Sequence, residues 1–181
     1  AMPLACGNSV VLKGSELCPY THRLLGEVLA EAGLPPGVLN VVLNAPADAA
    51  KVVEALIRHP AVRRVNFTGS TRVGRSIAEI AARYLKRCLL ELGGKAPFIV
   101  LEDADLEGAV NAAIFGAFLY QGQICMSTER FVVDDAVADE FVAKFAARIR
   151  GLEQGSPVSN PGSVVGPMIS QGSVQRINQL L

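Results

Sequence analysis

Cys125 and Glu91 are the two side chains whose types and setting could perform covalent chemistry in this chain. Cys125 follows a glycine-bearing turn in the run Gly-Gln-Ile-Cys-Met, and Glu91 lies 34 residues upstream, where an apolar run ends before two glycines. A thiol becomes a nucleophile when a base and a polarised environment are near it. A carboxylate buried at a strand end can have its pKa raised into the general-base range. Taken alone, such a pair is more often a buried thiol and a satisfied carboxylate.

A turn that could bind an anion lies at residues 67–74, after a strand-like run and before a helical pattern. Backbone N–H groups and the helix dipole favour a negative charge there. Gly69 would let a phosphate approach closely, and Ser70 could cap the helix or donate to the phosphate. The stretch matches neither Gly-x-Gly-x-x-Gly nor a P-loop. A plain serine cap after a tight turn is therefore the competing interpretation.

Lys13 and Glu16 stand just past the first apolar run, at the carboxyl end of an expected strand. Nucleotides bind at the carboxyl ends of parallel strands. An acidic side chain there can accept both hydroxyls of an adenine ribose and would repel a 2′-phosphate, which favours NAD over NADP. The competing interpretation is a solvated Lys/Glu pair on a loop.

The composition argues against several other classes of protein. Half of the 181 residues are apolar and 19% are charged, with 17 basic and 17 acidic side chains. A net charge of zero gives no reason to expect nucleic acid or an anionic membrane as a partner. The chain shows no membrane-length apolar run and no signal peptide, so we expect a cytoplasmic protein with reduced thiols. No Cys-x-x-Cys pair occurs among the four cysteines, and we expect no metal site.

The elements that must position these residues alternate between strands and helices. Strands are expected at 10–12, 38–43, 65–67 and 89–92, and helices at 24–32, 52–57 and 73–84. This order, with near-continuous apolar strands, predicts an α/β fold: a parallel, Rossmann-like sheet with helices on both faces.

A second α/β block is expected to follow. It has strands at 98–101 and 131–133, helices at 105–119 and 137–149, a loop at 151–166 and the start of a helix at 170–181. We place the boundary at the Gly93-Gly94 hinge, between a domain at 1–92 and the beginning of a catalytic domain at 93–181. The chain reads as an internal fragment, since the second block has only begun.

Five segments in register resemble the aldehyde dehydrogenase superfamily. They are Val-Val-Leu-Lys-Gly-Ser-Glu at 10–16, Ala-Gly-Leu-Pro-Pro-Gly-Val-Leu-Asn-Val-Val at 32–42, Phe-Thr-Gly-Ser-Thr at 67–71, Leu-Glu-Leu-Gly-Gly-Lys at 90–95 and Gly-Gln-Ile-Cys at 122–125. The stretches at 44–46, 63–66 and 125–130 look most similar to the salicylaldehyde and vanillin dehydrogenases of aromatic catabolism.

The resemblance implies a catalytic role for two residues. Cys125 would attack the aldehyde carbon, and the thiohemiacetal would pass a hydride to NAD, leaving a thioester. Glu91 would activate the water that hydrolyses the thioester, and the backbone N–H of Cys125 would supply part of the oxyanion hole.

The resemblance also implies contacts with the cofactor and the substrate. The residues expected to contact NAD are Lys13 and Glu16 at the adenine ribose, Gly69, Ser70 and Val73 at the pyrophosphate, and Phe67 and the Leu92 carbonyl at the nicotinamide. The residues expected to contact the aldehyde are Phe118, Ile124 and Met126. For these last three, ordinary core packing is an equal alternative.

The chain departs from the family pattern at two informative places. Gly14 stands where proline is usual and is expected to loosen the ribose loop, and Tyr120 stands where asparagine is usual, close to Cys125. Family members are also more than twice this long. We therefore predict NAD-dependent oxidation of a salicylaldehyde-like aldehyde to its acid, by a homo-oligomer when full length. The alternatives are an aliphatic or semialdehyde dehydrogenase, or a catalytically inactive NAD-binding fragment.

Overall fold

The computed structural model describes residues 2–180 and consists of two compact units. The first unit ends at Glu91 and the second begins at Leu92. Strand β4 (Arg87–Leu92) therefore carries the boundary. The assignment of these units to cofactor binding and catalysis stays a prediction.

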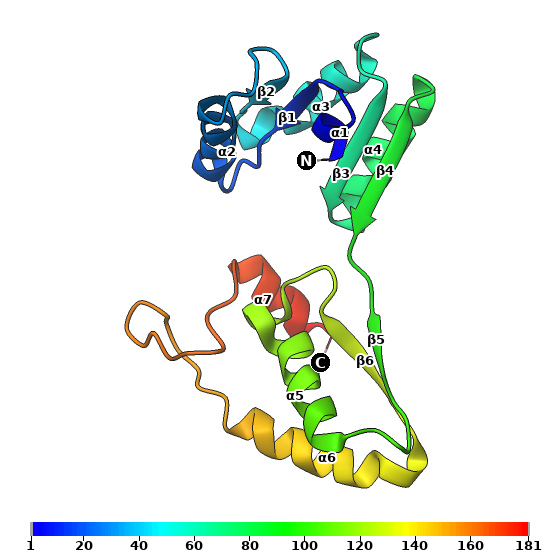
Figure 1. Cartoon of the computed structure of the whole chain (residues 1–181), viewed down its shortest axis with the longest axis vertical. Coiled ribbons are helices and arrows are strands. Elements are labelled where there is room, and N and C mark those ends of the chain that lie inside the picture. The colour runs from blue at the N-terminus through cyan, green and yellow to red at the C-terminus, as the bar shows by residue number, and fades with distance from the viewer. Residues whose placement is uncertain (1, 181) are drawn as a thin grey trace. The chain divides into compact units, whose positions relative to one another are not determined.

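Two β-α-β motifs form the framework of the first unit (Figure 1). Strand β1 (Val10–Lys13) lies parallel to β2 (Leu39–Val42), and α2 (Pro19–Glu31) connects them. Strand β3 (Arg64–Gly69) is hydrogen-bonded to β4, and α4 (Thr71–Arg83) connects that pair. The other elements of this unit are α1 (Met2–Ala5), the 3-10 helix η1 (Pro46–Asp48) and α3 (Ala49–Arg58).

The second unit contains a third β-α-β motif. Strands β5 (Ala96–Val100) and β6 (Thr128–Val133) are parallel, and α5 (Leu106–Phe118) runs between them in the chain. The remaining elements are the 3-10 helix η2 (Leu119–Gly122), α6 (Asp135–Arg150) and α7 (Gln171–Asn178). The expected loop after residue 150 is confirmed, since α6 ends at Arg150 and α7 begins only at Gln171.

The predicted α/β class with parallel strands is confirmed, but the strands are grouped differently from the expectation. Within residues 2–180 the first unit holds two separate two-stranded ladders where one four-stranded sheet was expected. Each ladder joins strands that are consecutive in the chain, because each crossover helix has 13 residues and returns the chain beside the strand it left. The described residues contain no strand that bridges the ladders of the first unit.

Local capping residues fix where several helices begin. Ser70, Asp105, Asp134 and Ser170 each accept a backbone N–H from the first turn of the helix that follows. Such a side chain satisfies one of the N–H groups that a helix start leaves without a partner. The helix α2 begins instead with Pro19 at its first position, five residues before the first apolar residue of the predicted pattern.

Each unit has its own small hydrophobic core. Ile57, Ile77 and Ala81 are buried in the first unit, between α3, α4 and strands β3 and β4. The second core contains Val100, Val110, Ala113 and Phe141, and joins β5 and β6 to α5 and α6. No helix within residues 2–180 combines the length and apolar character needed to cross a bilayer.

Candidate cofactor and nucleophile sites

Three polar side chains meet at the carboxyl ends of β1 and β2. Lys13 ends β1, Glu16 follows it, and Asn44 follows β2. The Lys13 ammonium pairs with Oε1 of Glu16, and Asn44 Nδ2 donates to the same Oε1 at 3.0 Å. Asn44 Nδ2 also donates to the Ala45 carbonyl oxygen at 2.8 Å. We call Lys13, Glu16 and Asn44 the ribose cluster, because the loop after a parallel strand is where a nucleotide ribose binds.

The ribose cluster keeps Glu16 ionised. Hydrogen bonds to the Glu16 carboxyl lower its pKa from 4.5 to about 2. The largest contribution comes from Lys13, and smaller ones come from the backbone of Glu16 and from the Asn44 amide. The carboxylate is mostly covered, with 19% of the side chain exposed. A negative charge at this position can accept hydrogen bonds from hydroxyl groups and repels a phosphate monoester.

The two carboxylate oxygens of Glu16 differ in their side-chain partners. Oε1 of Glu16 already accepts from two side chains, and Oε2 has no side-chain partner within residues 2–180. The expected acceptance of both hydroxyls by Glu16 stays a prediction. Asn44 Oδ1 is also buried without a hydrogen-bond partner.

The expectation that Gly14 loosens this loop is wrong. Gly14 is buried, and its N–H extends the β1–β2 ladder by donating to the Val42 carbonyl oxygen at 2.8 Å. A Cβ at this position would lie 2.5 Å from Cδ2 of Leu43 and 3.2 Å from Cβ of His22. The Leu43 and His22 side chains therefore pack against Gly14, and proline would remove its hydrogen bond.

The expected pyrophosphate turn is formed by the end of β3 and the start of α4. Ser70 caps α4, since its Oγ accepts the N–H of Val73 at 3.4 Å. This cap was the competing interpretation for Ser70, and it leaves the hydroxyl proton available to an anion. A Cβ on Gly69 would lie 2.6 Å from the Phe67 ring, so glycine at this position accommodates that ring. The structure thus brings Phe67 and Gly69 into contact, and Val73 is partly exposed on the same turn.

The Glu91 carboxylate lies near the end of β4, followed by Leu92. The strand position is as expected, but the expected burial is not found, because Glu91 is exposed and Leu92 is half-buried. The alternation of burial along β4 places these neighbours on opposite faces. Glu91 belongs to the first unit and Cys125 to the second, so their pairing stays a prediction.

Cys125 lies in a tight turn between η2 and β6. The N–H of Ser127 donates to the Ile124 carbonyl oxygen at 3.0 Å, which places Cys125 and Met126 at the two central positions of the turn. Both side chains are exposed, whereas Ile124 is half-buried. Core packing is therefore excluded for Met126 within the described residues. Phe118 is half-buried and its ring lies 6.3 Å from that of Phe145, in agreement with the packing alternative.

The residues just before Cys125 adopt an unusual backbone. Tyr120, Gln121 and Gly122 all have positive φ angles, of 53°, 57° and 68°. Asparagine adopts this left-handed region more readily than tyrosine does. Tyrosine at position 120 therefore lowers the local stability of the backbone relative to asparagine. Three consecutive left-handed residues reverse the chain sharply after α5 and lead it into the turn that holds Cys125.

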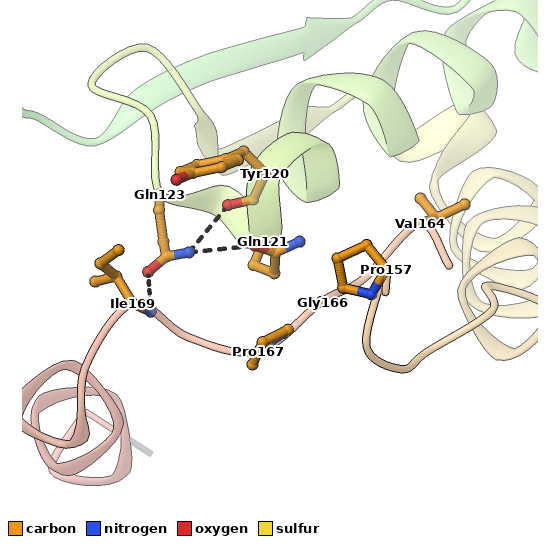
Figure 2. A pocket seen from close by; sticks show the side chains of 8 residues that line it. All are labelled: Tyr120, Gln121, Gln123, Pro157, Val164, Gly166, Pro167 and Ile169. Carbon is orange, nitrogen blue, oxygen red and sulfur yellow. Dashed lines mark hydrogen bonds between the residues drawn. The ribbon is translucent and has the colours of Figure 1, made fainter. Parts of the chain in front are cut away.

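Gln123 ties this reversal to a distant segment, as Figure 2 shows. Its Nε2 donates to the Tyr120 carbonyl oxygen and to Oε1 of Gln121, each at 3.3 Å, and its Oε1 accepts the N–H of Ile169 at 3.0 Å. A pocket of about 380 Å³ lies between the two segments. Its lining residues are Tyr120, Gln121, Gln123, Pro157, Val164, Gly166, Pro167 and Ile169.

Asn44 and Gln123 are the polar residues of these sites that the sequence analysis did not identify. Asn44 directly follows the second strand region, as Lys13 ends the first, so its position in the β-α-β pattern could have indicated it. Gln123 lies inside the Gly-Gln-Ile-Cys motif, but its partner Ile169 is 46 residues away. All four cysteines are free thiols, and residues 2–180 contain no group of three His, Cys, Asp or Glu side chains that could hold a metal ion.

Comparison with known proteins gives a consistent result across the chain. A family model described as the aldehyde dehydrogenase family matches residues 1–181. A vanillin dehydrogenase from Pseudomonas fluorescens is 62% identical over 181 residues, covering 100% of this chain and 37% of that protein. A salicylaldehyde dehydrogenase from Pseudomonas sp. strain C18 is 57% identical over 180 residues, covering 99% of this chain and 37% of that protein.

The fold is similar to that of a solved enzyme. The crystal structure of a salicylaldehyde dehydrogenase from Pseudomonas putida G7, complexed with salicylaldehyde, matches with a TM-score of 0.93 and 57% identity. The match covers 98% of this chain and 37% of that one. The chain thus spans little more than a third of the length of these relatives.

Proposed function

Because this chain belongs to the aldehyde dehydrogenase family, we propose that it supplies the nucleophile and the adenine-ribose site of an NAD-dependent aromatic aldehyde dehydrogenase. The substrate class is an aldehyde on a substituted aromatic ring, of the salicylaldehyde or vanillin type. The names of the similar proteins support this class. The proposal concerns the complete protein, in which we expect the chain to act as part of a homo-oligomer.

The observation that carries the proposal is the accessibility of the thiol and the backbone N–H of Cys125 in its turn. The thiol is exposed, and the N–H of the same residue donates to no acceptor within residues 2–180. The sulfur can therefore add to an aldehyde carbon while the N–H remains free to donate to the oxygen that becomes negative. One such donor typically contributes about 10²–10³-fold in rate. One residue thus offers both the sulfur and a donor for the oxyanion.

The remaining roles belong to Glu91 and the ribose cluster. NAD bound by the ribose cluster would supply the acceptor for the hydride that leaves the adduct on Cys125. Glu91 then removes a proton from the water that attacks the thioester carbon, and the acid leaves as the Cys125 thiolate is restored. The exposed position of Glu91 gives water access to its carboxylate. Lys13 and Glu16 hold the adenine ribose, with Ser70 at the start of α4 available to the pyrophosphate.

Substitution of Cys125 tests the proposal directly. In the complete protein, Cys125→Ala should abolish NADH formation while NAD still binds. Cys6→Ala is the matched control, because Cys6 is also an exposed free thiol in a turn. Initial rates should be compared for salicylaldehyde, vanillin, benzaldehyde and a short aliphatic aldehyde.

Glu91→Gln in the same assay separates the two halves of the reaction. A rapid burst of NADH should remain, and steady turnover should fall by about 10²–10⁴-fold, because only hydrolysis requires the base.

Substantial turnover by Cys125→Ala would refute the assignment of the nucleophile. Preference for the aliphatic aldehyde would refute the aromatic substrate class.

A further inference from the structure

The Asn44 side chain is held in an orientation that serves Glu16 and leaves its own oxygen without a partner. Nδ2 makes both of the side chain's hydrogen bonds, to Glu16 Oε1 and to the Ala45 carbonyl oxygen. Oδ1 is buried and unpaired. The opposite amide orientation would place Oδ1 against these two acceptors, so it is excluded by repulsion. Burying an unpaired acceptor opposes folding. The donor to Glu16 is therefore present together with an unpaired Oδ1, which lowers the stability of the fold locally.

That donor changes what Glu16 can present. Lys13 lies three residues from Glu16 on the same loop, whereas Asn44 lies 28 residues away, after the neighbouring strand. The two donors approach Oε1 from the ends of different strands and restrict rotation of the carboxylate. Lys13 alone, on a flexible four-carbon stem, would not fix the plane of the carboxylate. With Oε1 occupied twice, Oε2 is the oxygen without a side-chain partner within residues 2–180.

We propose that Asn44 is a positioning residue for the cofactor, which fixes Glu16 so that Oε2 receives one adenine-ribose hydroxyl and excludes a 2′-phosphate. This inference rests on the proposed use of NAD. Asn44 acts through Glu16 and contributes to cofactor choice, because a carboxylate free to rotate can turn away from a phosphate. The lowered pKa of Glu16, to which Asn44 contributes, agrees with this arrangement.

A double-mutant cycle on cofactor binding tests this role without any aldehyde. Dissociation constants for NAD and for NADP are measured by calorimetry on the complete protein. The variants are Asn44→Ala, Glu16→Gln, the double variant, and Asn40→Ala as the control. Asn40 is an exposed asparagine of β2 whose amide donates to the Gly37 carbonyl oxygen, away from the ribose cluster. Asn44→Ser is used in the same cycle if Asn44→Ala does not fold.

The expected result is a coupled loss of preference. Wild-type protein should bind NAD more tightly than NADP, and Asn44→Ala should reduce that ratio by about tenfold, as for loss of a hydrogen bond to a charged group. In the Glu16→Gln background the same substitution should change the ratio by less than about twofold. Asn40→Ala should leave the ratio unchanged.

Two outcomes would overturn the inference while leaving the proposed function intact. The first is that Asn44→Ala weakens NAD and NADP by the same factor in both backgrounds, which is the result of a purely structural role. The second is that Asn44→Ala lowers the ratio by the same factor in the wild-type and Glu16→Gln backgrounds, which would show that Asn44 does not act through Glu16. If the wild-type protein binds no NAD, the proposed function fails, and the role of Asn44 fails with it.

Discussion

Glu16 couples the candidate cofactor site to the stability of the fold through its ionisation. Its carboxyl pKa is about 2 in the folded chain, against an ordinary value of 4.5, chiefly because of Lys13. A carboxyl group whose pKa is lower in the folded than in the unfolded state stabilises the fold, and this contribution is complete at pH values above the unfolded-state pKa. That contribution is lost as the pH falls toward the folded value. For Glu16 the window therefore runs from about pH 5 down to about pH 2.

Acid sensitivity should accordingly depend on this residue. The unfolding free energy of wild-type protein should fall more steeply between pH 5 and pH 2 than that of Glu16→Gln, because glutamine takes up no proton. Urea unfolding at several pH values measures the slope. Glu31→Gln is the control, since Glu31 is exposed and makes no ion pair in the described part of the chain. Equal slopes for wild type and Glu16→Gln would contradict the assignment.

At the level of elements, one aromatic cluster holds α6 against β6 in the second unit. Phe141 is 1% exposed, and its ring centroid lies 6.1 Å from that of Phe131 and 5.6 Å from that of Phe145. Lys144, one turn further along α6, pairs with Glu107 of α5 at the surface. Exposed ion pairs contribute little, whereas a buried aromatic ring contributes through both transfer and packing.

These two positions on α6 should differ strongly on truncation. Phe141→Ala should destabilise the protein by about 3–5 kcal/mol, because the core cannot fill the space left by the ring. Lys144→Ala should have a much smaller effect. The effect should not change with pH near neutrality, because Glu107 raises the pKa of Lys144 above its ordinary value and the side chain stays charged. Chemical unfolding of both variants under the same conditions measures the difference. Similar losses for the two would contradict the larger contribution assigned to the ring.

At the level of the whole molecule, the chain matches its family over its full length but spans 37% of its relatives. The first core has three buried apolar side chains and the second has four. Several large apolar side chains are exposed, including Leu17 at 87% and Phe115 at 66%. Small cores with exposed apolar surface give marginal stability and favour association.

Residues 1–181 expressed alone should therefore self-associate and fail to oxidise aldehyde. The proposed reaction requires both Cys125 and Glu91, which belong to different units. A marginally stable, self-associated chain would not hold these two side chains in a productive arrangement. Size-exclusion chromatography reports the association, and an NADH assay with NAD and salicylaldehyde reports the activity. A monodisperse preparation with the turnover of the complete protein would show that these residues are sufficient.

The sequence by itself determined the features that depend on neighbouring residues. Apolar periodicity predicted the alternating strands and helices, and Ser70 was correctly anticipated as a possible helix cap. The five segments in register, which include the motifs around Glu91 and Cys125, indicated the family, which the comparisons confirm. These features follow from contacts within one or two turns of the chain, and such contacts leave a pattern in local residue order.

Only the tertiary structure decided which distant groups meet. It joined Asn44 to Glu16 across 28 residues and Gln123 to Ile169 across 46. It also packed Leu43 over Gly14, exposed Glu91 and divided the strands into separate ladders. Sequence spacing alone does not establish these contacts, because they depend on how whole β-α-β motifs pack and on which backbone groups those motifs leave free to bond.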